Sequence, residues 1–191
     1  MKKFIALAGI VSLVTLTSSY SQVTITNFNE AITADLPWVW SSSNKTLSIN
    51  SPNSNSGSLY PNDPVSPFTI GSNNQLRLTL ANTVTGGVTP GGGFRISLES
   101  SGGGLATAIF SWSTFTTSTT GTASFTTAGS WNASQVVQWN IFDGGSGGTG
   151  GLTGAQLVSL QAVPEPSTYA LMALGGLVLF FIARRRKAQQ A

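Results

Sequence analysis

Two segments near the middle of the chain alternate strictly between apolar and polar residues, and this period of two restricts them to β-strands. In QLRLTL, residues 75–80, every second residue is leucine. GFRISLES, residues 93–100, repeats the pattern, and the turn sequence SGGG separates it from LATAIFSWSTF, residues 105–115. Successive side chains of a strand point to opposite faces, so each segment has one face to bury. The sequence therefore predicts a β-hairpin over residues 93–115.

The rest of the middle region shows weaker strand patterns and no helical period. Turns rich in Gly, Asn, Pro and Ser separate these patterns, and two longer stretches, residues 51–64 and 143–154, have the composition of surface loops. The weaker strand candidates are residues 23–28, 46–50, 66–70, 122–128, 135–142 and 155–163. About nine short strands in one region of this length favour an all-β domain over residues 22–162, a single β-sandwich of jelly-roll type.

The chain contains no cysteine, so no disulfide can support this fold. A domain of about 140 residues is large enough to bury a hydrophobic core of its own. We therefore expect burial of the apolar strand faces to stabilise the domain.

The C-terminal segment AVPEPSTYALMALGGLVLFFIARRRKAQQA combines three features in a fixed order. Val163-Pro164-Glu165-Pro166 comes first, an uncharged apolar stretch follows, and the cations Arg184, Arg185, Arg186 and Lys187 come last. An uncharged stretch of about 18 residues forms a helix of roughly 27 Å, close to the thickness of the hydrocarbon core. The sequence predicts a transmembrane helix over residues 168–183, with residues 184–187 as a cytoplasmic basic stop.

The N-terminus has the three parts of a secretory signal peptide. Lys2 and Lys3 precede an apolar stretch, and small polar residues follow it. The spacing of Ser19 and Ser21 predicts a signal peptide over residues 1–21, with signal peptidase cutting between Ser21 and Gln22. The precursor is then expected to pass through the secretion translocon, cross the inner membrane once and hold its middle region outside.

The ordered tail resembles the PEP-CTERM sorting signal of Gram-negative bacteria that make exopolysaccharide. The similarity covers residues 163–187, with the motif at 163–166, and the same tail is also catalogued as an ice-binding protein C-terminal domain. The resemblance implies an exosortase as partner, a membrane protease that uses its own cysteine nucleophile and cuts near the motif. It implies delivery to the cell surface or the extracellular matrix, and it carries no direct information about residues 22–162.

Charge excludes nucleic acid as a partner of the exported region. Six of the nine cations lie in the terminal targeting segments. Residues 22–163 retain Lys45, Arg77 and Arg95 against five carboxylates, 3 − 5 = −2. Without a basic patch the domain cannot neutralise phosphates.

Few residues could perform catalysis. The chain lacks His and Cys, so Ser-His-Asp triads, thiol nucleophiles and imidazole zinc sites are excluded. Two carboxylates could serve a glycosidase, but Glu30 and Asp35 flank an ordinary turn and are expected to be solvated. We therefore expect no catalytic residue, no metal and no cofactor.

Binding residues are easier to nominate. Trp112 and Trp139 share strand faces with apolar neighbours, which predicts that both belong to the core. Trp38 and Trp40, in LPWVW, are the candidate residues for stacking on sugar rings. The Thr-rich residues 114–129 also allow an ice-binding surface, although their spacing is irregular and exposed strand explains them equally.

The sequence thus predicts a non-enzymatic exported protein of the bacterial envelope, sorted by an exosortase, with a structural or exopolysaccharide-associated role. A carbohydrate-binding module and an ice-binding adhesin are the two alternatives.

Overall fold

The computed structural model describes residues 22–35, 38–49, 57–84, 92–143, 154–165, 175–180 and 182. The chain divides into two compact units, Gln22–Val163 and a second unit made of residues 1–21 and 164–191. The predicted division of the chain, with an exported domain over 22–162, stays a prediction. The predicted signal peptide, residues 1–21, lies outside the described residues.

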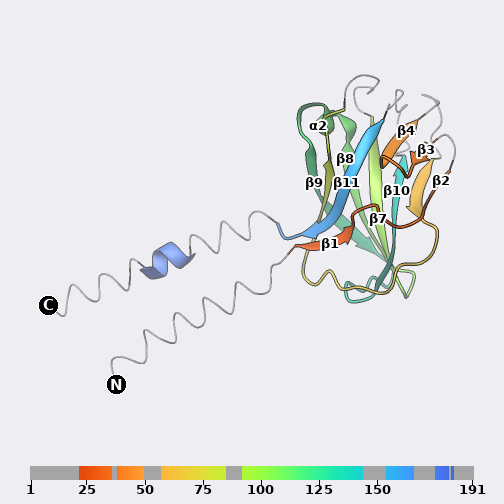
Figure 1. The fold of residues 1–191 in the computed structure, drawn as a ribbon. Coiled ribbons are helices and arrows are strands. Elements are labelled where there is room, and N and C mark those ends of the chain that lie inside the picture. Colours follow the sequence, from red (N-terminus) through yellow and green to blue (C-terminus); the bar gives the residue numbers. More distant parts are fainter. Residues whose placement is uncertain are drawn as a thin grey trace. The chain divides into compact units, whose positions relative to one another are not determined.

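The described part of Gln22–Val163 contains eleven strands and one short helix (Figure 1). The strands are β1 Val23–Thr26, β2 Ile32–Ala34, β3 Trp38–Ser41, β4 Thr46–Ile49, β5 Ser58–Pro61, β6 Gln75–Leu80, β7 Gly93–Ser100, β8 Leu105–Ser111, β9 Thr120–Ala128, β10 Val136–Asp143 and β11 Ala155–Val163. The helix is α2 Trp112–Thr117.

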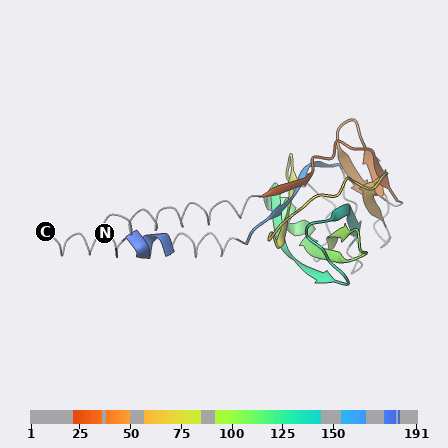
Figure 2. The ribbon, with the colours of Figure 1, turned by 90° about the horizontal axis from the view of Figure 1, so that it is seen from below.

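The strands form one antiparallel sheet in the order β2-β5-β10-β7-β8-β9-β6-β11-β4-β3, with β1 on β11. Strand β9 pairs with β6 through Thr120–Ser124 and with β8 through Phe125–Ala128, so it links two groups of strands. β2 and β3, at opposite ends of this order, contact each other, so the sheet is nearly closed around the core (Figures 1 and 2). The all-β fold class is confirmed, whereas the two-layer sandwich stays a prediction.

The strongest sequence patterns correspond to the observed strands. Residues 75–80 and 93–100 are β6 and β7 with the predicted bounds, and the weaker candidate 155–163 is β11 with its predicted bounds. β7 and β8 form the predicted hairpin, in which Gly103 adopts a φ of 76° that favours glycine. In contrast, residues 66–70 contribute only an isolated bridge from Phe68 to Val136.

The prediction that the second hairpin strand extends to residue 115 is wrong. The strand ends at Ser111, and the next residues form α2. The Ser111 hydroxyl accepts a hydrogen bond from the Ser113 backbone N–H, which caps the helix. Trp112 and Phe115 are three residues apart, share one helix face and are both buried. Burial of these two rings therefore outweighs the weak helix propensity of the intervening Ser and Thr.

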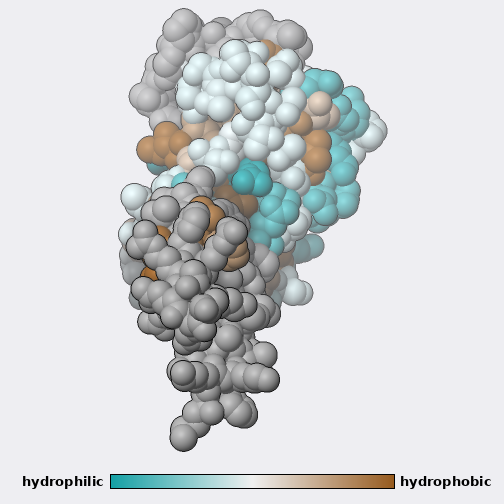
Figure 3. Space-filling view, turned by 90° about the vertical axis from the view of Figure 1, so that its left-hand side faces the viewer, coloured by the Kyte–Doolittle hydropathy of each residue, from teal (hydrophilic) through white to brown (hydrophobic). Residues whose placement is uncertain are grey.

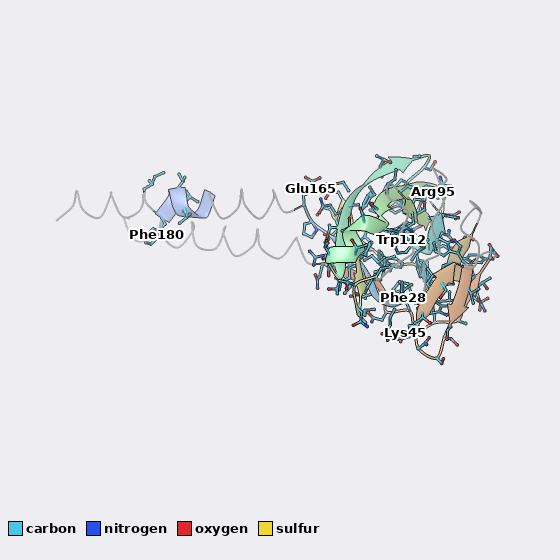
Figure 4. The ribbon with its side chains drawn as sticks, turned by 90° about the horizontal axis from the view of Figure 1, so that it is seen from above. Phe28, Lys45, Arg95, Trp112, Glu165 and Phe180 are labelled. Atoms are coloured by element: carbon cyan, nitrogen blue, oxygen red, sulfur yellow. The ribbon has the colours of Figure 1, made fainter. Side chains whose placement is uncertain are left out.

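The interior is rich in aromatic rings. Phe94 stacks on Phe110 with ring centroids 5.3 Å apart and lies 4.1 Å from the Trp112 ring. A second group joins Phe28 to Trp139 in an edge-to-face contact at 5.5 Å. Figure 4 shows Trp112 and Phe28 within the ribbon. Trp112 and Trp139 are buried, as predicted, but Trp112 reaches the core from a helix.

The C-terminal unit is described only in part. Of the predicted span over residues 168–183, the structure describes residues 175–180 and 182, which are helical. Within the described residues, no helix is long and apolar enough to cross a membrane. The remainder of the predicted span, and the cations at 184–187, lie outside the described residues.

Candidate functional site

The sorting motif begins on the last strand of the domain. Val163 is the final residue of β11, pairs with Gln75 of β6 and is buried. Pro164 and Glu165 follow it directly in the chain and belong to the other compact unit. Pro166 lies outside the described residues. The predicted motif therefore starts without any linker after the folded domain.

The strand that carries the motif lies inside the sheet. β11 pairs with β6 along one side, while β4 and β1 pair with successive parts of the other side. Both sides of β11 are therefore hydrogen-bonded. A cut after Val163 would leave all of these pairings in the domain.

The two ends of the domain emerge side by side. Val23, the first residue of β1, pairs with Ala162 of β11 in an antiparallel register. Gln22, the predicted mature N-terminus, is exposed, whereas Ser21 lies outside the described residues. The residue that follows the predicted signal peptidase junction and the first residue of the sorting motif thus lie at neighbouring strand ends.

The prediction that Trp38 and Trp40 form an exposed platform for sugars is wrong for Trp38, which is 1% exposed. Residues two apart on a strand share a face, and on β3 both tryptophans face inward while Val39 is exposed. Trp40 is half-buried, packs against the core and lies 6.3 Å from the Phe28 ring. Trp38 therefore offers no open face for stacking on a sugar, and sugar stacking by Trp40 stays a prediction.

Glu30 is not the solvated surface carboxylate that the sequence suggests. Its Oε1 accepts a 2.9 Å hydrogen bond from the Trp139 indole N–H, and its Oε2 accepts a 2.8 Å bond from the Thr26 hydroxyl. The Thr26 oxygen also accepts from the Phe28 backbone N–H at 2.7 Å, where Phe28 has a φ of 56°. Glu30 thus ties the end of β1 to β10, and it has a structural role.

The outward side of β5, β10, β7 and β8 gathers residues that sequence reasoning did not connect. We call this surface the Arg95 face and define it by Tyr60, Arg95, Ser97, Thr107, Asn140 and Phe142. Register places Phe142 opposite Arg95, and Asn140 opposite Ser97, which lies opposite Thr107. The intervening residues of these strands, such as Ile96 and Trp139, point into the core. Alternation in the sequence shows which side chains face outward, but not which of them are neighbours.

Arg95 is the cation at the centre of this face. Its guanidinium carbon lies 5.3 Å from the centroid of the half-buried Phe142 ring, within the range of a cation–π contact. Arg95 is exposed, and its guanidinium forms no hydrogen bond or ion pair within the described part of the chain, not even with Glu99 on the same strand. Figure 4 labels Arg95 near the outer edge of the ribbon. Its donors are therefore oriented by Phe142 and open to solvent.

Tyr60, on β5, holds the other end of the face. Its hydroxyl donates to Asp35 Oδ1 at 3.3 Å, and the Ser58 hydroxyl donates to Asp35 Oδ2 at 2.6 Å. Burial and the neighbouring Asp35 carboxylate, which also accepts the phenol hydrogen bond, raise the pKa of Tyr60 above its usual value. The phenol is therefore protonated at neutral pH. On the opposite part of the face, the Ser97 and Thr107 hydroxyls hydrogen-bond at 2.9 Å.

The Arg95 face supplies guanidinium, amide and hydroxyl groups beside two aromatic rings. These groups can donate hydrogen bonds to a polar ligand and accept hydrogen bonds from it. Such contacts bind a ligand and involve no chemical reaction. Figure 3 shows one side of the domain, where much of the described surface is of intermediate hydropathy, with apolar patches and hydrophilic residues along one margin.

Comparison with known proteins supports the tail assignment. A family model described as the PEP-CTERM protein-sorting motif matches residues 162–187. No curated protein and no solved structure matches the chain significantly. The match spans the last two residues of β11, the Pro-Glu-Pro motif, the apolar stretch and the cations. Residues 162–187 are therefore a PEP-CTERM protein-sorting motif, which marks this chain as an exported protein targeted to an exosortase.

Proposed function

We propose that the protein is a structural, non-catalytic component of the bacterial envelope or extracellular matrix that associates with exopolysaccharide. In this proposal the precursor is inserted once in the inner membrane with Gln22–Val163 outside. An exosortase cuts near residues 163–166, and the domain is delivered to the surface. The secretion translocon and signal peptidase act on the precursor before the exosortase does.

The observation that carries the proposal is the junction between β11 and the sorting motif. The motif follows the buried Val163 directly, and β11 is paired on both sides. Cleavage on the C-terminal side of this residue removes the tail and leaves the sheet whole. Processing is therefore compatible with release of a folded domain.

Two features of the domain support association with polysaccharide over other partners. Residues 22–163 carry a net charge of 3 − 5 = −2, which disfavours polyanions such as nucleic acid. Their outward strand faces supply hydroxyl and amide groups that suit a ligand rich in hydroxyls.

The ice-binding alternative has less support from the fold. An ice-binding face needs threonines in a regular array on a flat surface, yet Thr114, Thr116 and Thr117 lie on α2. Only the later part of the Thr-rich stretch, on β9, is strand. A carbohydrate-binding module based on Trp38 fails because that ring is buried.

The sorting step can be tested with an epitope tag placed after Ala191, in a host that carries an exosortase. We expect the tag to stay in the inner membrane while an antibody against the domain follows the processed protein outward. Glu165→Ala should leave insertion intact and block maturation, and deletion of residues 184–187 should impair retention. A tag found on surface-located protein would show that the tail is a plain anchor.

The matrix role is tested separately by fractionating the same cells. The mature protein should co-sediment with exopolysaccharide and should leave that fraction when synthesis of the polysaccharide is deleted. A mature protein that is fully soluble in the medium of the producing strain would contradict the matrix role.

A further inference from the structure

We propose that the Arg95 face is a binding site for a neutral glycan chain. This inference deepens the proposed association with polysaccharide and rests on it. The Arg95 face lies on the outward side of the adjacent strands β5, β10, β7 and β8, whereas the rings of Trp38 and Trp40 pack inward.

The first support is the orientation of Arg95. Phe142 lies opposite it on β10, and the guanidinium over this ring keeps its donors exposed and unpaired among the described residues. Holding a long side chain in one place before binding reduces the entropy lost when a ligand orders it. A planar fork of this kind can donate to two neighbouring oxygens at once.

The second support is the row of small polar groups beside Arg95. Asn140, Ser97 and Thr107 lie opposite one another on β10, β7 and β8, and Thr126 on β9 continues the row. Ser97 is 6% exposed and its hydroxyl bonds to that of Thr107, so the groups open to a ligand are those of Asn140, Thr107 and Thr126. Adjacent strands are about 4.8 Å apart, which spaces these three groups across the sheet. An extended ligand with repeated hydroxyl groups can satisfy such a row.

The third support is the charge balance, which selects a neutral ligand. The face has one cation, Arg95. It has two carboxylates nearby: Glu99, on the same side of β7, and Asp35, beside Tyr60. Asp35 already accepts hydrogen bonds from Ser58 and Tyr60. An acidic polysaccharide would meet net repulsion from this face and from the domain as a whole, whereas a neutral one would not.

The apolar groups of the face fit the same ligand. Ile109, which adjoins the Arg95 face, lies opposite Arg95 on β8 and is 76% exposed. Tyr60 is half-buried at the other end of the face. Sugar rings present C–H groups beside their hydroxyls, so a glycan can contact both the apolar and the polar side chains.

The test is native affinity electrophoresis of the fragment Gln22–Val163, which holds every described strand and the described core. The gels contain galactomannan, dextran or hydroxyethyl cellulose as neutral probes and alginate as an acidic probe. We expect retardation by at least one neutral probe and none by alginate. Arg95→Gln and Asn140→Ala should each weaken it about tenfold, the usual effect of losing a hydrogen bond to a charged or well-placed group.

Arg77→Gln is the matched control, because it removes the same charge from the half-buried arginine of β6, outside the Arg95 face. Arg95→Lys keeps the charge and loses the planar contact with Phe142, so it should also weaken binding. Arg95 is exposed, and neither it nor Asn140 has a side-chain hydrogen bond to another described residue, so these variants should keep the wild-type unfolding midpoint.

Three outcomes would overturn the inference: no retardation by any neutral probe, unchanged retardation of Arg95→Gln, or stronger retardation by alginate. If one of these occurs while the mature protein still co-sediments with exopolysaccharide in cells, the matrix role stands and only the assignment to this face fails. Loss of co-sedimentation in cells refutes the broader proposal instead.

Discussion

Replacing Glu30 by alanine should destabilise the domain through the loss of its part-buried hydrogen bonds. The Glu30 side chain accepts hydrogen bonds from the Trp139 indole and the Thr26 hydroxyl. Trp139 is 0% exposed, and its indole N–H loses its partner in the described part of the protein when the carboxylate is removed. Leaving a buried donor unsatisfied costs about 1–3 kcal/mol. We expect a loss of about 2 kcal/mol in the free energy of unfolding, because Thr26 retains its bond to Phe28.

Urea and thermal unfolding of the fragment Gln22–Val163, followed by tryptophan fluorescence, measure this loss. In a domain of this size about 1 kcal/mol corresponds to a change of about 2–4 °C in Tm, so Glu30→Ala should lower Tm by about 4–8 °C. Glu30→Gln keeps an oxygen for the indole and should lose less than half as much.

Glu99→Ala is the matched control, since Glu99 makes no side-chain hydrogen bond or ion pair to other described residues. Its effect should stay within about 0.5 kcal/mol. A Glu30→Ala domain as stable as wild type, or one no less stable than Glu99→Ala, would refute the structural role of Glu30.

Three further predictions concern the same fragment. Gly57→Ala should destabilise it by about 1–3 kcal/mol in urea unfolding, because a Cβ at this position would lie 1.7 Å from Cδ1 of the buried Trp38; an unchanged midpoint would contradict this packing. Tyr60 is its sole tyrosine, so tyrosinate absorbance should titrate with a pKa above the usual value of about 10, and Asp35→Asn should lower that pKa. The raised pKa favours the folded state while the phenol is protonated, so this contribution is present at neutral pH and is lost as the pH rises through the folded-state pKa. Deleting Val23–Thr26 should lower Tm because it removes the pairing of β1 with β11; full retention of Tm would show that β1 is dispensable.

Sequence patterns revealed β6 and β7 because apolar and polar residues alternate along their sequences. β11 came from a weaker pattern, and its alternation is interrupted by a register shift between Leu157 and Ser159. β2, β3 and β5 have only three or four residues each, and β5 lies within a stretch whose Pro, Asn and Ser content suggested a loop. β3 pairs with the neighbouring strand β4, whereas β5 pairs with β10, which is distant in the chain.

Other features depended on tertiary contacts that local sequence does not encode. The helix α2 forms because Trp112 and Phe115 can be buried together, although threonine favours strands. The outward position of Arg95 was predictable, but its place beside Phe142 requires the register between β7 and β10. Glu30 looked like a surface residue because its partner Trp139 is 109 positions away.

The most direct test of exosortase sorting is the intact mass of the mature protein, purified from the surface or medium of a host that carries an exosortase. We expect a product that begins at Gln22 and ends near Val163-Pro164-Glu165-Pro166, without the apolar segment or the cations at 184–187. Unfolding of this product should match that of the fragment Gln22–Val163, since the sheet is complete at β11. A surface-located protein whose mass still includes the residues up to Ala191 would contradict cleavage at the motif.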